Sequence, residues 1–159
     1  MTIDDTGAIT LAHGGGGKAM GDLVEGLFVA AFGQPHTTLE DQARLDLAPH
    51  LAPGGRLALT TDSFVVDPLF FPGGDIGKLA IWGTVNDLAV GGAKPLWLSA
   101  AFILEEGLAM ATLKRVVASM AAAAAAAGGV VVSGVTKVVG RGRAAQLFIT
   151  TSGVGVLPP

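Results

Sequence analysis

The sequence predicts an α/β fold in which helices pack on one mixed β-sheet. Two observations support this. Apolar residues recur at helical spacing over residues 19–32, 76–90 and 110–127. Between these segments lie apolar runs typical of strands, of which PLWLSAAFIL at 95–104 is the longest. A chain of 159 residues fits one domain, so residues 1–159 are expected to form a single unit.

The N-terminal third is expected to hold one helix between irregular segments. Residues 1–10 are predicted to be a loose arm or a short strand. The four glycines of 14–17 cannot sustain a helix, so the helix over 19–32 starts after them. Residues 34–55 are polar and rich in proline, which predicts mostly loop with a short strand around 43–47.

The remaining elements alternate strands with helices. Strands are expected at 56–62, 95–104, 130–133 and 146–156, and helices at 76–90 and 110–127. Thr112 is predicted to be the N-cap of the last helix. The loop over 64–74 carries three large apolar residues, Leu69 to Phe71, which are expected to anchor it. Ser133–Lys137 is expected to be a polar turn.

The composition excludes several classes of function. A net charge of −3 gives no basic footprint for nucleic acid. The chain has no cysteine, and its three histidines show no zinc-binding spacing. The uncharged stretch Val116–Thr136 is long enough to span a membrane, but its alanines and glycines favour a helix, a turn and a strand. With no signal peptide in the sequence, we expect a cytoplasmic protein without a membrane partner.

The glycine-rich segment His13–Lys18 is the first candidate for ligand binding. It is not a Walker A loop, because Ala12 and Ala19 stand where that motif needs Gly and Ser or Thr. A glycine-rich turn before a helix still offers backbone N–H groups and a positive helix end to a phosphate. The alternative is a flexible hinge.

Acidic and basic residues form two further candidates. Asp62 ends a predicted strand, and Asn86 and Asp87 lie within an apolar helix, where such residues are poor helix formers. The carboxylates suit Mg²⁺, which binds one or two carboxylates plus substrate phosphates. The alternative is a capping residue and a solvated helix face. Lys137, beside Thr136, is suited to phosphate as a point charge, or belongs to a basic surface loop.

Several blocks together resemble the N-terminal domain of the HypE family of hydrogenase maturation factors. They are HGGGGK at 13–18, DQARLD at 41–46, TDS at 61–63, DPLFFPGG at 67–74, IGKL at 76–79, GTVNDL at 83–88, FILEEG at 102–107 and TKVV at 136–139. The resemblance covers about residues 10–157. That family belongs to the superfamily of aminoimidazole ribonucleotide (AIR) synthetase, or PurM, selenophosphate synthetase and thiamine phosphate kinase.

The resemblance implies a fold, a cofactor and partners. The fold would be a PurM/AIR synthetase-like N-terminal domain whose strands pair across a homodimer. The cofactor would be ATP with Mg²⁺. The family uses ATP to dehydrate a cysteine S-carboxamide to a thiocyanate, the source of the cyanide ligands of iron in [NiFe]-hydrogenase. A HypF-like carbamoyltransferase and a HypC–HypD-like complex are the implied partners.

The resemblance also assigns roles to residues of this chain. Lys137 and Asp87 are the implied catalytic residues, and Asp62 and Asp87 the implied metal ligands. The implied nucleotide-binding residues are Gly15, Gly16, Gly17, Lys18, Asp62, Asn86 and Thr136.

Two departures from the family pattern bear on activity. The family's C-terminal domain and its terminal cysteine are missing from this sequence. Val135 stands where the family motif GDTKVV has an aspartate, so metal and nucleotide affinity are expected to fall. Whether the chain is an enzyme is therefore left open, and the alternative is a non-catalytic, truncated interaction module that binds maturation partners or full-length HypE.

Overall fold

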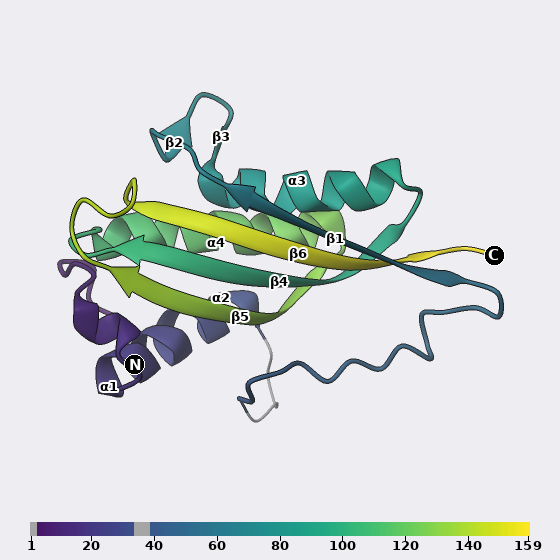
Figure 1. Cartoon of the computed structure of the whole chain (residues 1–159), viewed down its shortest axis with the longest axis horizontal. Helices are drawn as coiled ribbons and strands as arrows, with labels where there is room; N and C mark the ends of the chain where they lie inside the picture. The colour runs from purple at the N-terminus through teal and green to yellow at the C-terminus, as the bar shows by residue number, and fades with distance from the viewer. Residues whose placement is uncertain (1–2, 34–38) are drawn as a thin grey trace.

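The computed structural model describes residues 3–33 and 39–159, with the elements shown in Figure 1. The helical elements are η1 (Leu11–Gly14), α1 (Lys18–Leu23), η2 (Val24–Val29), α2 (Ala30–Phe32), α3 (Ile76–Val90) and α4 (Met110–Ala127). The strands are β1 (Arg56–Phe64), β2 (Phe70–Phe71), β3 (Gly74–Asp75), β4 (Lys94–Glu105), β5 (Val130–Val139) and β6 (Leu147–Leu157).

Four strands form one mixed sheet in the order β1-β6-β4-β5, so β1 and β5 are its edges. β4 and β5 are parallel, whereas β6 is antiparallel to both of its neighbours. Side chains alternate between buried and part-exposed along β4 and β6, because helices cover one face of the sheet and leave the other open (Figure 1). The predicted fold class, a mixed sheet with helices packed on it, is confirmed.

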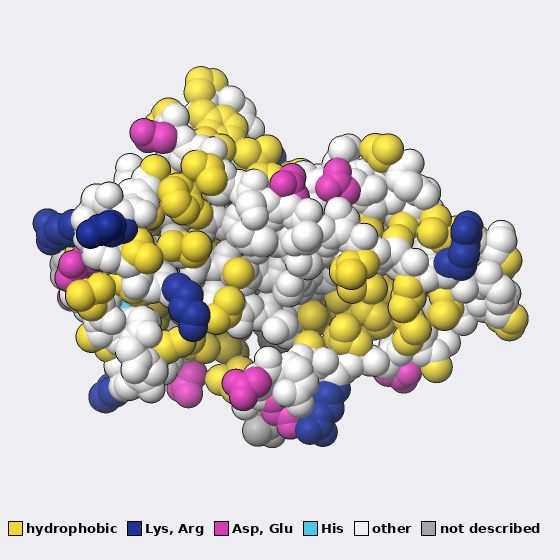
Figure 2. Space-filling view, viewed as in Figure 1, with side chains coloured by type: hydrophobic (Ala, Val, Ile, Leu, Met, Phe, Trp, Pro, Cys, Tyr) yellow, Lys and Arg dark blue, Asp and Glu magenta, His cyan; other side chains and the backbone are white. Residues whose placement is uncertain are grey.

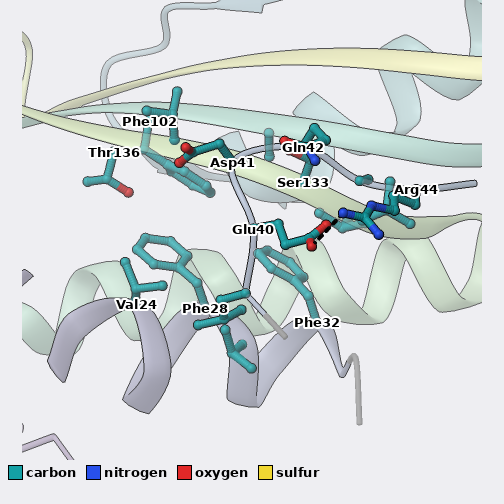
Figure 3. Close-up of a pocket in the computed structure, with 18 of the residues that line it drawn as sticks. Val24, Phe28, Phe32, Glu40, Asp41, Gln42, Arg44, Phe102, Ser133 and Thr136 are labelled. Carbon is teal, nitrogen blue, oxygen red and sulfur yellow. Dashed lines mark hydrogen bonds and ion pairs between the residues drawn. The ribbon is translucent and has the colours of Figure 1, made fainter. Parts of the chain in front are cut away.

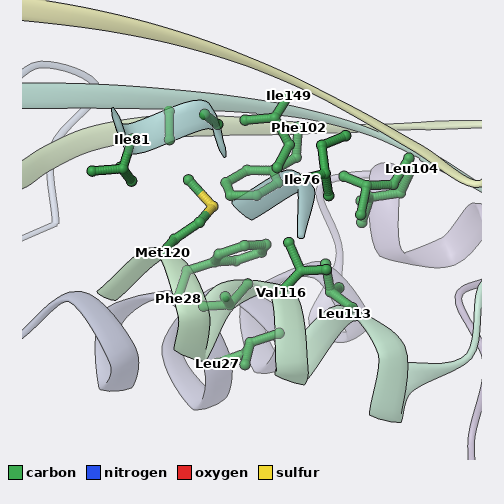
Figure 4. Close-up of a cluster of buried hydrophobic side chains, with 14 of the residues drawn as sticks. Leu27, Phe28, Ile76, Ile81, Phe102, Leu104, Leu113, Val116, Met120 and Ile149 are labelled. Atoms are coloured by element: carbon green, nitrogen blue, oxygen red, sulfur yellow. The ribbon is translucent and has the colours of Figure 1, made fainter. Parts of the chain in front are cut away.

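The core lies between the covered face of the sheet and the helices (Figure 4). α4 contributes Val116 and Met120, both fully buried, and the sheet contributes Phe102 and Ile149. The ring of Phe28, from η2, lies 4.8 Å from that of Phe102 between centroids. These apolar positions are the ones that the helical spacing and the strand runs of the sequence assign to the interior.

The open face of the sheet is partly apolar. Leu59 on β1 is 77% exposed, and Ile103, Val130 and Val135 are also exposed. Figure 2 shows this face, with hydrophobic side chains gathered toward its two ends and a polar band between them. Part of that band is cross-strand hydroxyl pairing, such as the 2.9 Å hydrogen bond from Ser152 to Thr61.

Helices α3 and α4 are joined by one carboxylate. Asp75, the N-cap of α3, accepts hydrogen bonds from the backbone N–H groups of Gly77 and Lys78. Its other oxygen accepts the hydroxyl of Ser119 on α4 at 2.6 Å. The cap therefore fixes the start of α3 against its neighbouring helix.

The structure corrects three sequence-based expectations. Residues 43–47 form no strand. Thr112 is not the N-cap of α4, since Ala109 occupies that position. Residues 133–137 are not a turn but the middle of β5, because parallel pairing with β4 satisfies their backbone and overrides their polar composition. The part of the predicted loop at residues 34–38 lies outside the described residues, as do the first two residues of the arm.

Two other expectations are confirmed. Leu69 is buried and anchors the loop after β1, while the guanidinium of Arg115 covers the ring of Phe70 at 4.0 Å from its centroid. The uncharged stretch is helix α4, a turn and β5. α4 is the one described helix long and apolar enough to cross a membrane, and it packs a full stripe of side chains into the core.

Candidate functional site

The glycine-rich segment lies beside edge strand β5. Gly14 packs so closely on Val138 that a Cβ at Gly14 would come within 3.0 Å of it. Gly16 has a φ of +77°, and no atom lies within 4 Å of the place that a Cβ would take. Glycine is therefore favoured here by the backbone conformation and not by a lack of space. Lys18 then begins α1 and pairs with Asp22 at 2.5 Å. Gly15 donates its N–H to the carbonyl of Ala12, whereas the exposed Gly16 and Gly17 present their backbone to a ligand.

A pocket of about 580 Å³ lies between the covered face of β5, the helical segment 18–32 and the segment 39–45 (Figure 3). Its floor is apolar, with Phe28, Phe32 and Phe102 among the lining residues. A cavity of this size with a few polar groups on its wall is typical of small-ligand sites.

Thr136, one of the predicted nucleotide-binding residues, lines this pocket and is 4% exposed. Asp41 lines it too, and in Figure 3 its carboxylate points along the pocket toward Thr136 and Phe102. Asp41 is not among the site residues predicted from the sequence. The sequence did hold a signal for this residue, because Asp41 is the first residue of DQARLD, one of the blocks that carry the family resemblance.

Lys137 does not share the pocket with Thr136. Successive residues of a strand point to opposite faces, so the side chains of Lys137 and Val135 point to the open face of the sheet, although Val135 also borders the pocket. Their β4 neighbours in the register are Ile103 and Ala101. Both Lys137 and Val135 are exposed.

The predicted metal ligands lie at the other edge of the sheet. Asp87, on α3, accepts a 3.1 Å hydrogen bond from the hydroxyl of Thr60 on β1. Asp62 is two residues further along β1, on the same face as Thr60. Asp62, Asn86 and Asp87 are all exposed. The fold therefore brings the two predicted metal ligands to one neighbourhood, as oxygen donors suited to a hard cation.

The predicted site residues thus fall into two groups. Gly15, Gly16, Gly17, Lys18, Thr136 and Lys137 lie at or beside β5, and Asp62, Asn86 and Asp87 lie at or beside β1. The two edge strands are three strand spacings apart, roughly 14 Å. Within residues 3–33 and 39–159, no three acidic or histidine side chains gather as a metal site.

Glu105, the last residue of β4, has a carboxyl group whose pKa is shifted by its surroundings. Hydrogen bonds from the backbone N–H groups of Gly142 and Gln146 lower the pKa of this carboxyl below its ordinary value, and Arg141 adds a smaller effect in the same direction. The carboxylate is therefore ionised at neutral pH and ties the loop after β5 to the end of β4.

Comparison with known proteins identifies relatives that match most of the chain. Residues 39–157 match the family "AIR synthase related protein, N-terminal domain". The carbamoyl dehydratase HypE of Rhodobacter capsulatus is 66% identical over 151 residues, which are 95% of this chain and 44% of that protein. The chain therefore spans less than half the length of this relative.

Solved structures agree with the sequence comparison. The crystal structure of a hydrogenase maturation protein HypE in complex with ATP superposes with a TM-score of 0.86 at 53% identity, over 94% of this chain and 43% of that one. A crystal structure of a HypE–HypF complex matches with a TM-score of 0.63 at 54% identity, over 85% of this chain and 42% of that one.

Proposed function

The chain belongs to the family of AIR synthase related proteins, as their N-terminal domain, and from this premise we propose that it is the nucleotide-binding domain of a HypE-like hydrogenase maturation protein. The observation that carries the proposal is the similarity, over 94% of the chain, to a HypE structure that contains ATP. The similarity favours this function over a non-catalytic interaction module.

We propose that the ligand is ATP with Mg²⁺. Gly16, Gly17 and Lys18 would hold phosphate through backbone N–H groups and one positive charge, while Gly15, whose N–H is bonded to Ala12, would let the ligand approach closely because it has no side chain. Asp62 and Asp87 would supply carboxylate oxygens to the cation, which also takes phosphate oxygens. Asn86 and Thr136 would add polar contacts to the nucleotide. The apolar pocket that Thr136 lines has room for a small ligand.

A single chain holds these groups at opposite edges of its sheet, so we propose that the site is completed by a second copy. Pairing β5 of one copy with β1 of the other would place the glycine-rich segment of one beside Asp62 and Asp87 of its partner. It would also cover two free sheet edges, which are otherwise prone to uncontrolled pairing. The exposed apolar residues of the open face, such as Leu59, would be buried in such a homodimer.

The reaction proposed for the longer protein is the ATP-dependent dehydration of a cysteine S-carboxamide to a thiocyanate. The chain contains no cysteine, so the reacting cysteine would come from outside it. Lys137 on the open face and Asp87 would be the residues nearest the chemistry. A HypF-like carbamoyltransferase is the proposed donor of the carboxamide, and a HypC–HypD-like complex the proposed acceptor of the cyanide. The structure of a HypE–HypF complex supports the first of these partners.

Calorimetric titration tests the nucleotide proposal. Mg-ATP should bind the parent chain saturably, and Asp87→Ala should abolish binding because a carboxylate at the cation is lost. Glu25→Ala is the matched control, since it removes another exposed acid from a helical segment, and it should bind as the parent does. A folded parent that does not bind Mg-ATP would refute the proposal, and unchanged affinity in Asp87→Ala would remove that residue from the site.

A further inference from the structure

The turn that follows β4 holds the arm that leads into the glycine-rich segment. Gly107 donates its N–H to the carbonyl of Ile9 at 2.7 Å, and Ile9 donates its own to the carbonyl of Leu108 at 2.8 Å. Ile9 is 1% exposed, so the arm is pinned by a buried side chain as well. The position of the glycine-rich segment is thus set in part by this turn.

The same turn holds a second segment through Glu105, the last residue of β4. One carboxylate oxygen accepts the N–H of Gly142 at 2.6 Å, and the other accepts the N–H of Gln146 at 3.1 Å. The backbone N–H of Glu105 donates in turn to the carbonyl of Gln146 at 2.8 Å. One side chain therefore holds the loop 140–146 at two points, near its start at Gly142 and at its last residue, Gln146.

The backbone of this loop is held in a conformation that its sequence does not favour. Gln146 has φ of +66°, in the left-handed region that residues other than glycine rarely occupy. Such a conformation persists only where surrounding contacts enforce it, and here Gln146 makes two hydrogen bonds to Glu105. Strain of this kind is concentrated at functional sites.

The loop presents arginine at the end of the molecule that carries the glycine-rich segment. The guanidinium of Arg141 lies over Gly107, where a Cβ would come within 3.4 Å of its Cζ. Val138, three residues before Arg141, packs on Gly14. In Figure 1 the loop and the glycine-rich segment lie at the same end of the sheet, and Figure 2 shows Lys and Arg side chains there.

We propose that Glu105 is a positioning residue that fixes the loop 140–146 so that the Arg141 guanidinium contacts the phosphate chain of the bound nucleotide. A guanidinium matches phosphate oxygens bidentately, and one that is already held in place loses less freedom on binding. This inference rests on the proposed function, because it assumes a nucleotide at the glycine-rich segment. The inference also gives a role to the FILEEG block at 102–107, which contains Glu105 but none of the predicted nucleotide-binding residues.

Limited proteolysis tests the anchoring without any ligand. Trypsin cleaves after arginine, and Arg141 and Arg143 are both exposed in the loop. Glu105→Gln removes the charge that holds the loop and should speed cleavage there by about tenfold, the scale of one charge-assisted hydrogen bond. Glu106→Gln is the matched control and should be cut at the parent's rate. Equal rates in Glu105→Gln and the parent, both folded by circular dichroism, would overturn the anchoring role.

Mg-ATP titration tests the contact with phosphate. Arg141→Ala and Glu105→Gln should each weaken binding by about tenfold, and the double variant should bind no more weakly than either, because both act through one guanidinium. Arg143→Ala should bind as the parent does. Parent-like affinity in Arg141→Ala would overturn the inference while leaving the proposed function intact. Failure of the parent chain to bind Mg-ATP would refute the proposed function. Proteolysis would still decide whether Glu105 anchors the loop.

Discussion

At the residue scale, the alternation of side chains along β5 decides what each of its polar residues can contact. Thr136 faces the helices and lines the pocket, whereas Lys137 and the side chain of Val135 face the open side, although Val135 also borders the pocket. The two residues on the open face lie on an edge strand, so they are accessible to a second copy. Residues that are adjacent in sequence can therefore make contacts on opposite faces of the sheet.

Restoring an acid at position 135 is predicted to strengthen cation-dependent binding. The resembling motif has an aspartate there, and a carboxylate is a ligand that Mg²⁺ prefers. Val135→Asp should tighten Mg-ATP binding by at least about tenfold, with no gain for ATP in the presence of a chelator. Val130→Asp adds the same charge to the same face and strand and should give no gain. Equal affinity of Val135→Asp and the parent would show that position 135 is not at the cation.

The hydrogen bonds to Glu105 predict a pH dependence of the loop 140–146. These hydrogen bonds lower the pKa of the carboxyl in the folded state. Its stabilising contribution is therefore complete above the ordinary glutamate pKa of about 4.3. The contribution is lost as the pH falls through the lower folded-state pKa. Amide NMR shifts of Gly142 and Gln146 should titrate with a midpoint below that ordinary value. They should not titrate in Glu105→Gln. A midpoint at or above the ordinary value would contradict the hydrogen-bonded geometry.

At the scale of elements, the close approach of α3 and α4 depends on one glycine. A Cβ at Gly77 would come within 2.4 Å of the carbonyl oxygen of Val116 and 2.8 Å of Met120 Cγ. The carbonyl belongs to helix backbone and cannot move aside as a side-chain end can. This contact sets how closely α3, which carries Asp87, approaches α4.

Gly77→Ala is therefore predicted to destabilise the fold by about 1–3 kcal/mol, the cost of overpacking a close contact. Gly21→Ala makes the same chemical change in α1, where nothing lies within 4 Å of the added Cβ. It should stabilise by up to about 1 kcal/mol, since alanine is the better helix former. Urea unfolding of both variants at one protein concentration measures the difference. Equal effects would contradict the close packing of α3 on α4.

The elements that the sequence predicts well are those whose pattern is local. The spacing of apolar residues locates α3 and α4, and the run at 95–104 locates β4. The length of β5 could not be predicted in this way, because residues 133–139 are polar or part-exposed and become a strand only by pairing with β4. The hydrogen bond of Thr60 to Asp87 likewise joins residues 27 positions apart, a contact that only the folded chain creates.

At the scale of the whole molecule, the two groups of predicted nucleotide-binding residues lie at opposite edges of one sheet. The glycine-rich segment borders β5, and Asp62 and Asp87 border β1. The sequence suggested all of these residues but not their separation, because the order of strands in a sheet depends on contacts far apart in the chain. The proposed completion of the site by a second copy would reconcile this separation with the similarity to a HypE structure that contains ATP.

Mixing two defective variants tests this composite site most directly. Asp87→Ala removes the β1 group and Lys18→Ala weakens the β5 group, so each alone should lose Mg-ATP binding. After subunit exchange at equal amounts, half of the dimers would be mixed, and each of these would have one intact site. Calorimetry should then recover binding at about one quarter of the parent's sites. Recovery of none, from variants that are folded and dimeric, would place the whole site within one chain and contradict the account.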